Sequence, residues 1–185
     1  MISDRISILE LAAQENPQGV VVEIGVAGGH FTKQILATWP TCSRLYAVDC
    51  WGPFEGNHLS DSDQEQRFRQ VTADFAKHAN VKIVRQYSHI AAIAIPHESV
   101  DFIYIDADHS HAAALRDLRS WYTKLKKKGI MAGHDYYNGC GVKSAVDEFG
   151  AQKSLTVNVT TAEYSRESAV HGPGWEGPSF WFRRL

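Results

Sequence analysis

Short apolar runs alternate with amphipathic segments along most of this chain. The apolar runs that fit strands lie at 19–25, 43–49, 81–86, 100–106, 129–135, 154–160 and 179–184. The segments with helical spacing lie at 5–15, 31–39, 63–79, 88–95, from His111 to just before Gly129, and at 140–149. Strands that alternate with helices favour a parallel sheet. The pattern therefore predicts an α/β fold with a doubly wound, mostly parallel sheet of seven strands, an antiparallel final strand and helices on both faces.

The length predicts one domain over 1–185, because a chain of 185 residues can bury a substantial core. Residues 1–18 are predicted to form an N-terminal helix and its lead-in. The segment 163–178 is rich in Gly, Pro and polar residues, which predicts a long mobile loop carrying an isolated Trp175.

Charge and composition narrow the classes of partner. The net charge is -2, and the basic run at 124–129 is the one such run, which we interpret as the solvated end of a helix. A nucleic-acid-binding protein usually has a broader positive face. The beginning of the chain is too polar for a signal peptide and no stretch is long enough to span a membrane, which predicts a soluble cytoplasmic protein. The three cysteines have no metal-binding spacing, and an odd count argues against a disulfide framework.

Polar residues follow four of the predicted strands. The first strand contains Glu23 and ends in a glycine-rich loop, and the second ends at Asp49. The fourth ends in "DADHSH" from Asp106, and the fifth ends in "HDY" from His134. Ligands of open α/β sheets bind outside the carboxyl ends of the strands, so the sequence predicts a shared ligand site there.

The glycine-rich loop argues against a dinucleotide cofactor. A Rossmann NAD site requires G-x-G-x-x-G, whereas the chain from Gly25 reads G-V-A-G-G-H. Ala27 and His30 take the second and third glycine positions. Asp49 does not discriminate, because any adenosine-binding fold can place a carboxylate on the ribose hydroxyls. An NAD-dependent oxidoreductase is therefore disfavoured.

Three stretches together resemble the successive motifs of class I S-adenosylmethionine-dependent methyltransferases. They are "VVEIGVAGGHFTKQIL", "LYAVDCWG" and "VDFIYIDADHSHAAALRDLRSWYTKLKKKGIMAGHDY", and the similarity covers about 19–150. Within that family the chain most resembles the small bacterial group related to macrolide-sugar and catechol-type O-methyltransferases. The resemblance implies a Rossmann-like fold, S-adenosylmethionine as cofactor and a small-molecule hydroxyl as the methyl acceptor.

The resemblance also implies roles for individual residues. Glu23 and Gly25 would lie by the methionine end of the cofactor, and Asp49 would bind its ribose hydroxyls. Gly28 and Gly29 belong to the same loop, in which Ala27 replaces a family glycine and Gly28 would offset that change. The remaining predicted cofactor contacts are Trp51 and Ser88, which would border the adenine, and Asp106.

Metal-dependent members of the family place carboxylates at the ends of the fourth and fifth strands. Asp106 and Asp135 match these positions, and His134 stands beside them in place of a carboxylate or small residue. The predicted ligand set is therefore Asp106, His134 and Asp135, with Mg²⁺ suited to the carboxylates and Mn²⁺ or Zn²⁺ favoured by the imidazole. In the macrolide-sugar branch a histidine three residues after the first metal aspartate acts as base, and His109 matches it. A base and a cation both help a hydroxyl lose its proton before methyl transfer.

Several alternatives remain open from the sequence. His109 could have a structural role, and Asp108 and Ser110 could cap the helix that begins near His111. The chain could be a metal-independent methyltransferase acting on another atom, or a non-catalytic module that binds S-adenosylmethionine or a nucleotide. The loops at 52–62 and 163–178, or a second subunit in a homodimer, would have to close the acceptor pocket.

Overall fold

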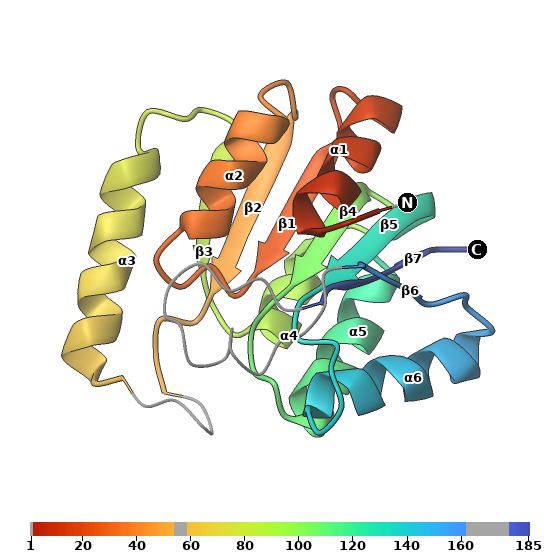
Figure 1. The fold of residues 1–185 in the computed structure, drawn as a ribbon. Helices are drawn as coiled ribbons and strands as arrows, with labels where there is room; N and C mark the ends of the chain where they lie inside the picture. The colour runs from red at the N-terminus through yellow and green to blue at the C-terminus, as the bar shows by residue number, and fades with distance from the viewer. Residues whose placement is uncertain (1, 54–58, 162–177) are drawn as a thin grey trace.

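The computed structural model describes residues 2–53, 59–161 and 178–185 and confirms the predicted fold class. One sheet of seven strands runs in the order β3-β2-β1-β4-β5-β7-β6, with β7 antiparallel to both of its neighbours (Figure 1). The strands are β1 Val20–Ile24, β2 Arg44–Asp49, β3 Val81–Arg85, β4 Val100–Ile105, β5 Leu125–Gly133, β6 Asn158–Val159 and β7 Phe180–Arg183. The helices are α1 Arg5–Glu15, α2 His30–Thr38, α3 Asp61–Phe75, α4 Ser88–Ala91, α5 His111–Tyr122 and α6 Gly141–Lys153, with a 3₁₀ turn at Ala92–Ala94.

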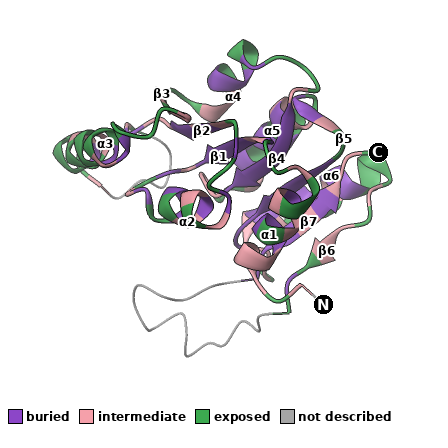
Figure 2. Ribbon diagram, turned by 90° about the horizontal axis from the view of Figure 1, so that it is seen from above, coloured by how far each residue is buried: buried purple, intermediate pink, exposed green. Residues whose placement is uncertain are grey.

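Alternation of side chains along the central strands sends apolar residues to both faces of the sheet. On one face, Val21 and Phe102 pack with α1 and α2, and α3 covers the neighbouring part of β2. On the other face, Val22 and Ile103 pack with α4, α5 and α6. All of β4 is buried, as expected for a central strand covered from both sides (Figure 2). The helices on the two faces hold the strand ends in fixed positions. The polar residues of the predicted site come directly after these strand ends.

The predicted boundary between the fifth helix and the fifth strand is wrong. The helix was expected to include Leu125 and to end just before Gly129, but α5 ends at Tyr122 and β5 already begins at Leu125. Leu125 is fully buried and pairs with Val100 of β4, and the Lys126 ammonium contacts both carboxylate oxygens of Asp101 at 2.9 Å. The basic run therefore forms the start of a strand, because β4 supplies an apolar partner for Leu125 and a carboxylate for Lys126. The sequence pattern of the run itself does not show these contacts.

Other predicted boundaries shift by smaller amounts. The strand expected at 154–160 shortens to Asn158–Val159, and the helix expected at 140–149 extends to Lys153. The predicted helix at 63–79 is α3, which begins at Asp61 because Ser60 and Asp63 form a capping box. Residues 163–177 of the predicted loop, including Trp175, lie outside the described residues. Across the part of the chain that the structure describes, no helix is long and apolar enough to span a membrane.

Candidate active site

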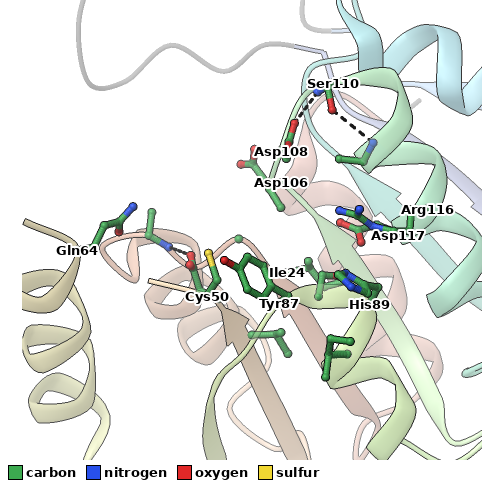
Figure 3. A pocket seen from close by; sticks show the side chains of 18 of the residues that line it. Ile24, Cys50, Gln64, Tyr87, His89, Asp106, Asp108, Ser110, Arg116 and Asp117 are labelled. Atoms are coloured by element: carbon green, nitrogen blue, oxygen red, sulfur yellow. Dashed lines mark hydrogen bonds between the residues drawn. The ribbon is translucent and has the colours of Figure 1, made fainter. Parts of the chain in front are cut away.

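The carboxyl ends of β1, β2 and β4 surround a main cavity of about 660 Å³. Gly25, Asp49 and Asp106 line it from the sheet, and residues of α3, α4 and α5 complete its walls (Figure 3). This is the place at which open α/β sheets bind ligands, and the volume lies in the range of small-molecule sites.

Glycine is required at position 25 by two separate features. Its φ is 89°, in the left-handed region, and an added Cβ would collide with the backbone carbonyl of Asp106. Ala27, the departure from the family pattern, is itself left-handed with φ 48°, and its N–H donates to Asp49 Oδ2 at 2.8 Å. The Ala27 conformation costs about 1–2 kcal/mol, which this hydrogen bond helps to offset. The loop therefore keeps its shape without the family glycine.

The two other glycines of the loop lie outside the cavity wall. Gly29 is the left-handed residue before α2, and a Cβ there would lie 2.8 Å from the ring of Phe75 in α3. Gly28 has space for a Cβ, which would meet only His30 at 3.6 Å, and its φ is not positive. The close packing of α2 on α3 thus explains Gly29, whereas Gly28 does not offset Ala27 by its conformation.

Asp49 faces the cavity with its carboxylate held in place from two sides. Oδ2 accepts from Ala27 N and Oδ1 accepts from Trp51 N, both at 2.8 Å. Each oxygen retains a second acceptor position, so the group can still bind two hydroxyls of a ribose. The structure thus fits the predicted role of Asp49.

Trp51 does not lie where it was predicted. Its ring is 1% exposed, packs on Phe68 with centroids 5.2 Å apart and donates from Nε1 to the Ala27 carbonyl at 2.9 Å. The ring does not line the main cavity, because it packs in the core with the apolar side chains of α3. Through its hydrogen bond to Ala27 it supports the glycine loop. Ser88, the other residue expected beside the adenine, does line the cavity.

Glu23 lies beneath the glycine loop, outside the cavity wall. Its side chain is 1% exposed, and Thr32 donates a hydrogen bond of 2.6 Å to Oε2. Burial raises the pKa of this carboxyl to about 8, so it is mostly protonated at neutral pH. Glu23 therefore contributes a neutral, hydrogen-bonded support between β1 and α2.

The four predicted metal and base residues meet in a group that we call the acidic rim: Asp106, His109, His134 and Asp135. Asp106, His134 and Asp135 each offer one ligand atom, and these atoms lie within 4.8 Å of one another. Asp135 is a left-handed residue with φ 60°, a strained conformation of the kind that collects at functional sites. Burial opposes its charge, but the neighbouring His134 and His109 hold the pKa of Asp135 below its usual value. Two carboxylates and an imidazole at this spacing suit a divalent cation.

His109 joins the rim from the loop that follows β4. Its Nε2 lies 3.5 Å from Asp106 Oδ1 and 3.2 Å from Asp135 Oδ2. The hydrogen bond with Asp106 raises the pKa of His109, against the effect of burial. The loop is fixed by local bonds: Asp108 Oδ1 accepts from Ser110 N, and Ser110 Oγ accepts from Ala113 N. Ser110 therefore caps α5, and Asp108 instead stabilises the turn before it.

Asp117, Arg116 and His89 form an end of the main cavity that the sequence did not predict. All three line the cavity, and Figure 3 shows them together, away from Cys50 and Gln64. Burial raises the pKa of Asp117 to about 6. One signal was available, because Asp117 lies midway between Ala113 and Trp121 at the helical spacing of a buried face. A carboxylate on such a face requires a partner.

The methyltransferase-domain family model matches residues 22–136, from β1 through the acidic rim. The chain belongs to this methyltransferase family. Its fold and family make it a class I S-adenosylmethionine-dependent methyltransferase, as the motifs predicted. No curated protein matches the chain significantly.

Solved structures of other methyltransferases share the fold at low sequence identity. The O-methyltransferase NovP is 17% identical with a TM-score of 0.67, covering 98% of this chain and 79% of its own. The precorrin-6y C5,15-methyltransferase of Geobacter metallireducens is 13% identical with a TM-score of 0.67, covering 97% and 87%. A Streptococcus mutans protein in complex with SAH is 16% identical with a TM-score of 0.66, covering 100% of both chains. At these identities the likeness establishes the fold of the methyltransferase and not its acceptor.

Proposed function

We propose that this methyltransferase transfers the methyl group of S-adenosylmethionine to a hydroxyl of a small molecule, with a divalent cation at Asp106, His134 and Asp135 and His109 as base. The observation that carries the proposal is the position of Asp106. Its side chain lines the main cavity and also belongs to the cluster of metal-type ligands. The methyl donor and the acidic rim would therefore meet at this residue.

The residues of the main cavity fit the cofactor. Asp49 would bind the ribose, and the bare backbone at Gly25 would allow close approach. S-adenosylmethionine supplies an activated methyl group on a sulfonium. Because its transfer is an in-line displacement, the main task of the chain is to hold the acceptor oxygen close to the methyl carbon and in line with the breaking bond.

The acidic rim fits the proton chemistry of a hydroxyl acceptor. A divalent cation held there would lower the pKa of a hydroxyl beside it. His109 is half exposed, and its Nε2 faces both carboxylates, so the imidazole is oriented toward the place at which the acceptor would lose its proton. A base in this position accepts the proton as the oxygen attacks.

The acceptor class follows from charge and from the resemblance. A net charge of -2 favours a small molecule over a nucleic acid, and NovP is an O-methyltransferase. Cytoplasmic location and a homodimer that closes the acceptor pocket stay predictions.

A second candidate is a metal-independent methyltransferase that acts on another atom. The observation that favours it is the pairing within the rim, where His109 and His134 already contact Asp135 at 3.2 and 3.3 Å. Imidazolium groups could neutralise the carboxylates without a cation. In that case the rim would orient the acceptor by hydrogen bonds.

Metal titration tests the proposal. Activity on a panel of hydroxyl acceptors, followed by release of S-adenosylhomocysteine, is expected to fall after chelation and to return with Mg²⁺ or Mn²⁺. The double variant Asp106→Asn, Asp135→Asn is expected to stay folded and to lose the metal response. The variant Asp147→Asn, which removes a carboxylate of α6 paired with Lys143 and Tyr136, serves as a control that keeps it. Full activity of a preparation shown by elemental analysis to be metal-free would favour the second candidate.

A further inference from the structure

Trp51 has a backbone conformation that a bulky residue rarely adopts. Its φ is 39°, in the left-handed region, and it lies two positions after the end of β2. Such a conformation persists only where the surrounding contacts enforce it, and residues of this kind collect at functional sites. Trp51 itself does not line the main cavity. The contacts that hold it therefore indicate what it does for the residues that do.

Trp51 closes a ring of hydrogen bonds with Ala27 and Asp49. Asp49 Oδ2 accepts from Ala27 N and Oδ1 accepts from Trp51 N, both at 2.8 Å. The indole Nε1 of Trp51 donates to the Ala27 carbonyl at 2.9 Å. Left-handed Ala27 is thus held from both ends, at its N–H by the carboxylate and at its carbonyl by the indole. The indole therefore fixes the residue that fixes one oxygen of Asp49.

A second set of contacts holds Trp51 from the side of α3. Arg85, the last residue of β3, donates from Nη2 to the Trp51 carbonyl at 3.1 Å. Its Nη1 lies 2.7 Å from Glu65 Oε2, and its guanidinium carbon lies 4.4 Å from the centre of the Phe68 ring. The indole packs on the same Phe68 ring. These contacts tie the loop after β2 to β3 and α3, so Trp51 is anchored from outside the cavity.

We propose that Trp51 is a positioning residue for the methyl donor, whose indole N–H holds Ala27 left-handed and thereby keeps the Asp49 carboxylate directed at the ribose. The proposal rests on the proposed binding of the ribose at Asp49 and requires neither the metal nor the hydroxyl acceptor. Without the indole bond, Ala27 is able to return to the right-handed region that alanine prefers. Its N–H then leaves Asp49 Oδ2, and the carboxylate loses one of the two bonds that orient it.

A double-mutant cycle on S-adenosylhomocysteine binding tests the proposal without any turnover. Trp51→Phe keeps an aromatic ring on Phe68 and removes the indole N–H. Calorimetry should show an affinity about 3–10-fold lower, as expected for the loss of one hydrogen bond. In an Asp49→Ala background the same substitution should change the affinity by less than about two-fold, because the carboxylate that Trp51 positions is then absent.

Trp39→Phe is the matched control. Trp39 is 1% exposed, as Trp51 is, and donates from Nε1 to the Pro17 carbonyl at 2.9 Å, but it lies away from the main cavity. The control should lower the free energy of unfolding about as much as Trp51→Phe does, and it should leave the affinity for S-adenosylhomocysteine unchanged. The comparison separates the positioning of Asp49 from a general loss of stability.

Two results overturn the proposal alone. One is a Trp51→Phe protein that binds S-adenosylhomocysteine as tightly as the wild-type protein, and the other is an equal loss of affinity with and without the Asp49 carboxylate. If Asp49→Ala by itself leaves the affinity unchanged, the assignment of the ribose to Asp49 fails together with the proposal.

A second variant decides if Trp51→Phe does not fold. Arg85 is exposed, and Arg85→Gln removes the donor to the Trp51 carbonyl without opening the core. It should weaken S-adenosylhomocysteine binding in the protein that retains Asp49 and have no effect in the Asp49→Ala background. Equal effects in the two backgrounds, or none in either, overturn the proposal.

Discussion

The main cavity and the acidic rim share Asp106 but are built in opposite ways. In the cavity, the carboxylate of Asp49 is held by two backbone N–H groups, those of Ala27 and Trp51. In the rim, His109 and Asp135 are held mainly by each other and by their charged neighbours, within 3.5 Å. The cavity therefore has its shape before a ligand binds, whereas the rim depends on the protonation of its own members.

This difference teaches how one sheet edge can combine binding with chemistry. A binding site works best when its groups are fixed in advance, because ordering them on binding would reduce affinity. A site that moves a proton needs groups whose charge can change, and closely placed carboxylates and imidazoles provide this. The cavity and the rim can be separated by variants that affect one and spare the other.

The variant Gly25→Ala should break the comparison by damaging both regions at once. Gly25 has a left-handed backbone conformation, and an added Cβ would collide with the backbone carbonyl of Asp106. The methyl group of alanine would therefore displace both the glycine loop and the start of the rim. We expect loss of S-adenosylhomocysteine binding and a decrease of roughly 3 kcal/mol in the free energy of unfolding.

The control is Gly139→Ala, because Gly139 has the same φ of 89° and nothing within 4 Å of an added Cβ. It should lose only about 1 kcal/mol, the cost of the left-handed conformation. Equal losses of stability in the two variants would show that the contact with Asp106 has no effect.

The variant His109→Ala should affect the rim alone. We expect kcat to fall about 10²–10⁴-fold, the usual contribution of a positioned base, while affinity for S-adenosylhomocysteine changes by no more than a few-fold. Steady-state kinetics with the identified acceptor and calorimetry measure the two effects. His111→Ala is the matched control, since His111 is partly exposed, lies outside the rim and pairs with Glu148 of α6. A His109→Ala enzyme that keeps most of its kcat would assign the histidine a structural role.

The variant Asp49→Ala should affect the cavity alone. If the Asp49 carboxylate accepts hydrogen bonds from two ribose hydroxyls, its loss should weaken S-adenosylhomocysteine binding about 10–100-fold, measured by calorimetry. The metal response of the remaining activity should persist, because Asp49 is not part of the rim. Unchanged affinity would remove Asp49 from the cofactor site.

The sequence predicted the fold and the rim because both depend on local pattern. Residues at the carboxyl ends of parallel strands meet at one edge of the sheet. The sequence alone could therefore place Asp106, His134 and Asp135 together, as the structure does. The start of β5 could not be predicted, since Lys126 is held by Asp101, which lies 25 positions earlier in the chain. The hydrophobic periodicity of a segment does not show an ion pair with a residue so distant in the sequence.

The cavity was harder to predict than the rim. Trp51 lies two positions after Asp49 and was expected beside the ligand, but its ring packs against the apolar side chains of α3 in the core. Asp117 was missed because a lone aspartate in a helix usually faces solvent. Both errors concern the direction of a side chain, which depends on the packing of separate elements.

The smallest expected effect concerns Asp117 of the cavity and is measured as the pH dependence of the free energy of unfolding. Burial raises its pKa to about 6 in the folded protein, from 3.8. The folded state therefore binds the proton more tightly than the unfolded state, and the stability that this provides is present at low pH and lost as pH rises through about 6. Between pH 4.5 and pH 7.5 the wild-type protein should lose about 2 kcal/mol relative to Asp117→Asn, which cannot titrate at this position.

Urea denaturation of both proteins at several pH values measures this difference, and other titrating groups cancel because both proteins share them. The stability of Asp117→Asn relative to the wild-type protein should be higher at neutral pH than at pH 4.5. Such a result would show that the buried carboxylate of Asp117 is ionised at neutral pH at the expense of stability. A difference that stays constant with pH would mean that burial does not raise the pKa of Asp117.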